Sequence, residues 1–110
     1  MNNLQRVELE VRGVELGQNE LIVYLQENGL NPHDEYNPQS LTAKRAIYQT
    51  AQSVLEGIAN NPDLMKSIKM DDMTISDFHE NLMARIDHLE KKIRKMKTDT
   101  ANTDIFMLFM

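Results

Sequence analysis

Histidines and paired aspartates are the residues of this chain whose types could support catalysis or metal binding. His79 opens the stretch HENLM, which begins like the zinc motif HExxH, but Met83 stands where the second histidine must be. A thioether is a poor zinc ligand, and His79 and His88 lie nine residues apart, so on one helix they face nearly opposite directions. Asp71 and Asp72 would point to opposite sides of a strand, which does not suit a paired acid and base. We therefore expect no catalytic residues, no metal, no cofactor and no enzymatic activity.

The length and composition of the chain limit the class of protein. The 110 residues are enough for one domain with a modest core. The chain has no cysteine, so it can form neither a disulfide nor a thiolate site. Its start, MNNLQRVELE, lacks the basic and apolar regions of a signal peptide, and no apolar run approaches the roughly 20 residues that span a bilayer. We expect a soluble protein that does not contact membranes.

The net charge of −5 conceals a separation of charge along the chain. Residues 91–97, KKIRKMK, carry five positive charges and no negative one, whereas the rest of the chain has a balance of −10. An acidic body does not favour wrapping nucleic acid, which requires a basic face. The basic run suits the end of a helix, where cations complement the helix dipole, or a positive face toward an acidic partner or passing DNA. This basic patch comprises Lys91, Lys92, Arg94, Lys95 and Lys97.

The hydrophobic periodicity predicts helices over 19–28, 41–59 and 77–97. In the helix at 41–59, one apolar stripe repeats at helical spacing and consists of Ile47, Ala51, Val54, Leu55 and Ile58. Residues 3–12 fit a helix or a strand equally well, and we favour the helix. Asn19 and Ser40 are placed to cap the first residues of their helices, and Ser76 or Thr74 to cap the last helix. Gly29 is placed to end a helix in the left-handed conformation. Residues 31–40 contain two Asn-Pro pairs and are expected to form a loop. PDLMKSI, after the stop at Asn60–Pro62, could add one helical turn.

A strand-like patch is expected just before the last helix, at about 67–75. Its apolar residues are spaced by twos on either side of the polar tip Asp71-Asp72. The last helix then carries a near-heptad seam from Phe78 to Met96, which could pack on the central helix, on a partner, or on both. The candidate subunit-interface residues are Ile68, Met70, Met73, Ile75, Phe78, Leu82, Ile86, Leu89 and Ile93.

The apolar run IFMLFM, residues 105–110, follows the polar stretch TDTANTD. Left free, such a run would favour aggregation, so it must be covered. It could fold back over its own core, or it could dock in a groove or at a sheet edge of a neighbour. We expect an all-α protein: a small helical bundle at 1–97 with one extended excursion, then a linker and extended docking tail at 98–110. The docking candidates are Ile105, Phe106, Met107, Leu108, Phe109 and Met110.

The order of these features resembles a known family from residue 4 to residue 97. The matching segments, in order, are LQRVELEV, ELIVYLQENGLNP, RAIYQTAQSVLEGIANNPDLM, SIKMDDMTIS and LMARIDHLEKKI. They are similar to the small all-helical head–tail connector, or adaptor, proteins of tailed bacteriophages and prophages. Asp71-Asp72 stands where that family has a Gly-Asp turn.

The resemblance implies a virion structural protein that forms a ring beneath a twelve-fold portal and bridges the capsid to the tail. Its partners would be further copies of itself, the portal protein and tail-side connector proteins, with DNA only passing through the channel. It would be assembled in the cytoplasm of a bacterial host and reside in the phage neck. The portal-docking role of the family's C-terminal extension carries over to Asp104–Met110 by apolar character alone. An acidic composition suits a channel that lets DNA pass without gripping it.

Two other interpretations remain open from the sequence. The first is a small dimeric nucleic-acid-binding regulator that uses residues 77–97 as a DNA-facing helix and dimer seam. The second is a non-viral helical scaffold whose tail completes its own core.

Overall fold

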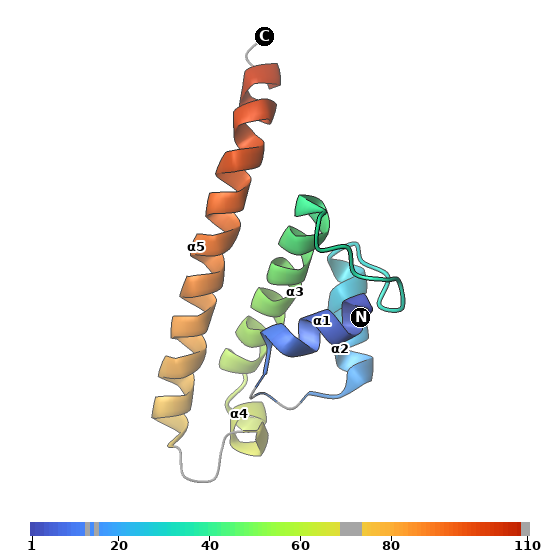
Figure 1. The fold of residues 1–110 in the computed structure, drawn as a ribbon. Coiled ribbons are helices and arrows are strands. Elements are labelled where there is room, and N and C mark those ends of the chain that lie inside the picture. The colour runs from blue at the N-terminus through green and yellow to red at the C-terminus, as the bar shows by residue number, and fades with distance from the viewer. Residues whose placement is uncertain (13, 15, 69–73, 109–110) are drawn as a thin grey trace.

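The computed structural model describes the backbone of residues 1–12, 14, 16–68 and 74–108, and among these the side chains of all but 67–68 and 97–108. Within that part of the chain the protein is all-α, as predicted, with five helices and no strand. The helices are α1 (Asn3–Glu10), α2 (Gln18–Glu27), α3 (Leu41–Ala59), α4 (Pro62–Ile68) and α5 (Ile75–Leu108). Helix α3 lies at the centre and contacts each of the other four, and α5 runs antiparallel along one side of it (Figure 1).

The central helix α3 has the bounds that the periodicity predicts. Ser40 caps it, because its Oγ accepts a hydrogen bond of 3.1 Å from the amide of Ala43. The predicted stripe is buried and forms the middle of the core. It consists of Ile47, Ala51, Val54, Leu55 and Ile58.

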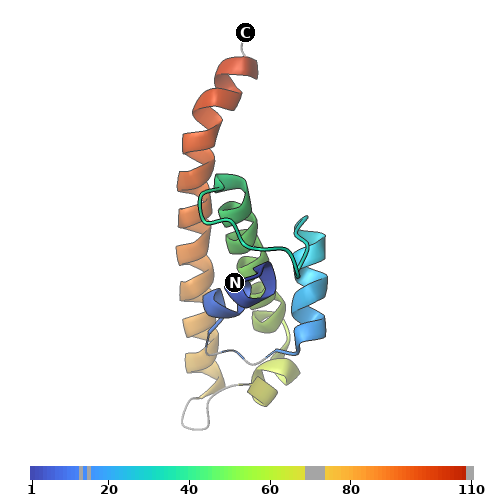
Figure 2. The same ribbon diagram turned by 45° about the vertical axis from the view of Figure 1, so that its right-hand side comes forward.

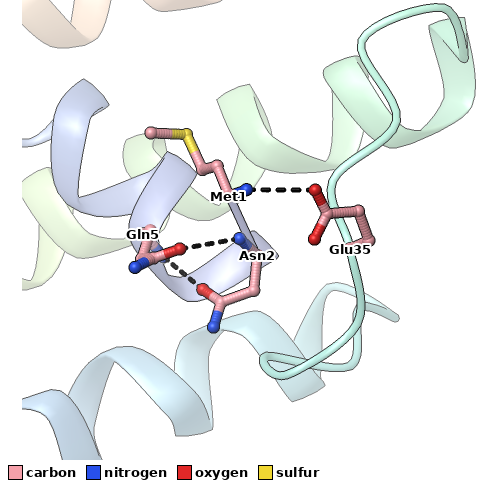
Figure 3. Close-up of polar contacts among 4 residues, drawn as sticks. All are labelled: Met1, Asn2, Gln5 and Glu35. Carbon is pink, nitrogen blue, oxygen red and sulfur yellow. Dashed lines mark hydrogen bonds and ion pairs between the residues drawn. The ribbon is translucent and has the colours of Figure 1, made fainter.

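Helix α1 settles the choice between helix and strand at residues 3–12. Asn2 and Gln5 form a reciprocal capping box. The backbone N–H of Gln5 donates to the Asn2 side-chain oxygen at 2.8 Å, and the backbone N–H of Asn2 donates to the Gln5 side-chain oxygen at 2.9 Å (Figure 3). Val7 is fully buried, whereas Leu9 is 41% exposed. A strand would have placed these two side chains on the same face, so their different burial fits the helix.

The first residues are tied to the loop between α2 and α3. The amides of Asn3 and Leu4 donate to the carbonyls of Asp34 and Pro32, each at 3.0 Å. The Met1 amine lies 3.0 Å from the Glu35 carboxylate, as Figure 3 shows. These bonds give the loop partners for its backbone groups and hold it against the start of α1.

Helix α2 ends as predicted but begins differently. Gly29 has φ 81°, and the Leu30 amide donates to the Leu25 carbonyl at 2.9 Å, which closes the last turn. The helix begins at Gln18 with Gly17 in the capping position, so the prediction that Asn19 caps it is wrong.

The extended segment expected at about 67–75 is helical at both of its ends. Ile68 is the last residue of α4, and Ile75 is the first residue of α5. Met70 and Met73 lie outside the described residues. Residue 75 is helical for a local reason. The Oγ1 of Thr74, the predicted cap, accepts a 3.0 Å hydrogen bond from the backbone amide of Asp77, so α5 starts immediately after Thr74.

The C-terminal stretch also departs from the prediction. Residues 98–108, expected to be a linker and an extended tail, continue α5 without a break. TDTANTD contains neither glycine nor proline, the two residues that end helices most effectively, so nothing in it forces the helix to stop.

Candidate functional site

The seam of α5 packs on α3 of the same chain. Phe78, Leu82, Ile86 and Leu89 are each at most 7% exposed and belong to one core with the α3 stripe. The expectation that these four residues form a subunit interface is therefore wrong: they stabilise the chain's own fold and are not accessible to a neighbour. The physical reason is that α3 presents an apolar stripe of matching length, so the seam is satisfied within the chain.

The remaining interface candidates are less buried or lie outside the description. Ile75 and Ile93 are half-buried, and Ile75 packs at the edge of the core. The side chain of Ile68 is not among those described. Burial on α5 thus decreases after Leu89, in the direction of the basic patch.

An aromatic and cationic cluster joins α1, α3 and α5 beyond the end of the core. The Lys92 ammonium lies 5.1 Å from the ring centre of Tyr48, and the Arg6 guanidinium lies 5.9 Å from the same ring centre. Arg6 also lies 5.4 Å from the ring centre of Tyr36. Each of these is a cation–π contact: that of Lys92 helps to hold α5 against α3, and those of Arg6 hold α1 against α3 and the loop of Tyr36.

Glu10 anchors the same cluster from α1. Its carboxylate lies 2.9 Å from Arg6, and its backbone carbonyl accepts a 2.8 Å hydrogen bond from Arg85 of α5. Burial by itself would lower the pKa of Arg6, but the hydrogen bond and the charge of Glu10 raise it, and the net pKa lies above its ordinary value. Arg6 therefore stays charged, as its contacts with the tyrosine rings require.

Two of the five residues of the basic patch form ion pairs within α5 itself. Lys91 lies 3.1 Å from Asp87, and Arg94 pairs with Glu90, so both of the acid–base pairs four residues apart are present. Lys92 contacts Tyr48, and Lys95 is exposed. The Lys97 side chain is outside the described set. Lys91 and Arg94 are thus paired locally, whereas Lys95 is accessible to a partner.

The last part of α5 projects beyond the rest of the molecule. The contact between Tyr48 and Lys92 sets the antiparallel register, which places the first turn of α3 level with about residues 97–99 of α5. In Figures 1 and 2 the helix continues past α3 with no other element beside it. The segment that runs on from there includes Ile105–Leu108 of the predicted docking tail, while Phe109 and Met110 lie outside the described residues.

Other surfaces carry less chemistry. A shallow pocket of about 230 Å³ is lined by Glu10, Ala84, Arg85, His88 and Leu89, and it is mostly apolar. No group of three or more residues that could hold a metal ion occurs among the described residues. In the same part of the chain, none of the helices combines the length and apolar character needed to cross a membrane.

The cluster around Tyr48 was not predicted from the sequence. Arg6, Tyr36 and Tyr48 belong to three different segments, and nothing in their spacing indicates that they meet. One weak signal was present: Tyr48 follows Ile47 of the buried stripe directly, so its ring had to lie at the edge of the core.

Comparison with known proteins gives no relative. No protein-family model matches the chain, and no curated protein or solved structure matches it significantly.

Proposed function

We propose that the chain is a virion structural protein: a head–tail connector subunit that assembles into a ring beneath the portal and bridges the capsid to the tail. The proposal rests first on the family resemblance of residues 4–97. The structural observation that supports it is the projecting end of α5. The helix leaves the bundle at about residue 99, and its sequence then becomes apolar from Ile105 onward.

The projecting segment favours a partner on energetic grounds. Isolated helices of this length are marginal in water, and threonine, asparagine and aspartate are weak helix formers. Each large apolar side chain buried against a partner contributes about 1.5–3 kcal/mol. A portal groove that covers residues 105–110 would stabilise the helix and remove an aggregation-prone run from water.

The experiment is binding to the portal protein encoded in the same genome, with and without residues 105–110. Full-length chain is expected to co-sediment with the portal as a ring that electron microscopy can detect. The truncated chain is expected to lose portal binding while its melting temperature stays within about 2 °C, because the buried core lies before residue 90. Unchanged portal binding by the truncated chain would remove the docking role from the tail.

The same truncation separates the alternatives. If the tail completes its own core, as in a non-viral scaffold, its removal should lower the melting temperature sharply. A nucleic-acid regulator should instead bind DNA at low salt and lose that binding when Lys91, Lys92, Arg94 and Lys95 become glutamine. The ion pairs of Lys91 and Arg94 within α5 weigh against the nucleic-acid regulator.

A further inference from the structure

A pocket of about 330 Å³ lies between the end of α2 and the start of α3. Its lining is half polar and consists of Asn28, Leu41, Thr42, Arg45, Ala46 and Gln49. The Nε atom of Arg45 is buried there without a hydrogen-bond partner, and Arg45 forms no ion pair among the described residues. The charge of the Arg45 guanidinium is thus not balanced by a carboxylate among the described residues, so this half-buried side chain favours a partner that brings one.

The rim of this pocket is apolar and basic. Leu41 is 56% exposed, which makes it the most exposed large hydrophobic residue in the described part of the chain. Lys44 lies within a turn of Leu41, next to Arg45. We call Leu41, Lys44 and Arg45 the α3 patch. A partner that fits it must pair an apolar side chain with Leu41 and carboxylates with the two cations.

Helix α2 exposes a surface with this complementary chemistry. Glu20, Val23 and Glu27 are spaced three and four residues apart, so they lie on one face of the helix. All three are exposed, Val23 at 52%, and neither glutamate forms an ion pair within the described residues. We call these residues the α2 patch: an apolar side chain between two carboxylates.

Within one copy the two patches are not paired: neither Glu20 nor Glu27 forms an ion pair with Lys44 or Arg45 among the described residues. Leu21 and Leu25 of α2 join the core, so the α2 patch lies on the opposite, exposed side of that helix. The α2 patch and Leu41 are therefore accessible to a second molecule, and Lys44 and Arg45 lie half-buried beside Leu41.

We propose that the α2 patch of one copy binds the α3 patch of a second copy, with Val23 against Leu41 and the glutamates against Lys44 and Arg45. Because the two patches differ, the contact is head-to-tail and can repeat around a closed ring. This inference rests on the proposed function, for which it names the residues that join neighbouring subunits. It requires no portal, so it can fail or hold independently of portal binding.

The test uses two full-length variants that reverse the charge of one patch each. The acid-reversed variant carries Glu20→Lys and Glu27→Lys, and the base-reversed variant carries Lys44→Glu and Arg45→Glu. Sedimentation equilibrium without portal is expected to show concentration-dependent association of the wild type. Each variant alone should associate at least ten-fold more weakly. An equimolar mixture should regain association, because every contact in an alternating assembly is again between opposite charges.

A matched control reverses two exposed glutamates elsewhere, Glu56→Lys and Glu80→Lys, and should associate as the wild type does. The exposed substitution Leu41→Ser tests the patch without touching Arg45, and it should also weaken association while the circular dichroism melt stays unchanged. Wild type that remains monomeric, variants that associate normally, or a mixture that fails to regain association would each overturn the proposal.

Discussion

The hydroxyl of Tyr24 occupies the space that a side chain at Gly57 would need. A Cβ atom placed on Gly57 would lie 2.5 Å from that oxygen, closer than real Cβ contacts come, and 3.5 Å from the ring carbon that bears it. Glycine in the last turn of α3 is therefore explained by the close approach of α2.

This relationship predicts that Gly57→Ala changes the free energy of unfolding in opposite directions in the wild type and in a Tyr24→Phe variant. Gly57→Ala should lower the free energy of unfolding by about 1 kcal/mol, because overpacking costs about 1–3 kcal/mol and the gain in helix propensity offsets about 0.5–1 kcal/mol. In a Tyr24→Phe background the clashing oxygen is absent, and Gly57→Ala should raise stability by about 0.5–1 kcal/mol. Urea denaturation of the four proteins measures both effects, and equal effects in the two backgrounds would rule out the clash.

The burial of the α5 seam predicts a contrast between adjacent residues. Leu82 is 1% exposed and Met83 is 47% exposed. Leu82→Ala should lower the free energy of unfolding by about 2–5 kcal/mol through the cavity it leaves. Met83→Ala serves as the matched control and should change stability by less than about 0.5 kcal/mol. If Leu82→Ala weakened only self-association and left the unfolding midpoint unchanged, the seam would be an interface after all.

The cation–π contacts predict that the ring of Tyr48, and not its hydroxyl, holds α5 beyond Leu89. Tyr48→Phe should be close to neutral, whereas Tyr48→Leu should lose about 0.5–1 kcal/mol for each cation that it no longer faces. Amide hydrogen exchange should locate the loss in residues 90–96 of α5. Equal exchange rates in the phenylalanine and leucine variants would show that the ring contributes no more than its apolar bulk.

Two neighbouring interactions at the start of α1 should contribute unequally to stability. Asn2→Ala removes the capping box and should cost about 1 kcal/mol of stability. Glu35→Gln removes only the pair with the Met1 amine, and the Glu35 side chain is 80% exposed. Surface pairs of this kind contribute little, so the second change should barely move the thermal midpoint. A larger effect at Glu35 than at Asn2 would contradict this ranking.

Local sequence signals predicted those parts of the fold that local interactions determine. The α3 stripe, the caps at Ser40 and Thr74 and the left-handed Gly29 each depend on residues within one or two turns, and each is confirmed. The exact start of α2 was missed, because Gly17 takes the capping position without a side-chain hydrogen bond that the sequence could have suggested.

The sequence did not predict which element or subunit packs against each apolar surface. The heptad pattern of α5 shows an apolar face but not whether α3 or another subunit covers it, since both would select the same residues. The Tyr48 cluster depends on the register between α1, α3 and α5, which no single segment encodes. The continuation of α5 through TDTANTD was missed because the apolar seam ends at Met96, although a polar stretch without glycine or proline can continue a helix.

The unbroken length of α5 has a mechanical consequence. A helix of 34 residues is about 50 Å long, and α5 is fixed to the bundle only along its first two thirds. It therefore acts as a lever that moves with the bundle: a rotation of the whole bundle by about 5° about the start of α5 would displace the far end of the helix by about 4 Å. A small change in how the bundle is seated would in this way be amplified into a large change in where the opposite end of the rod points.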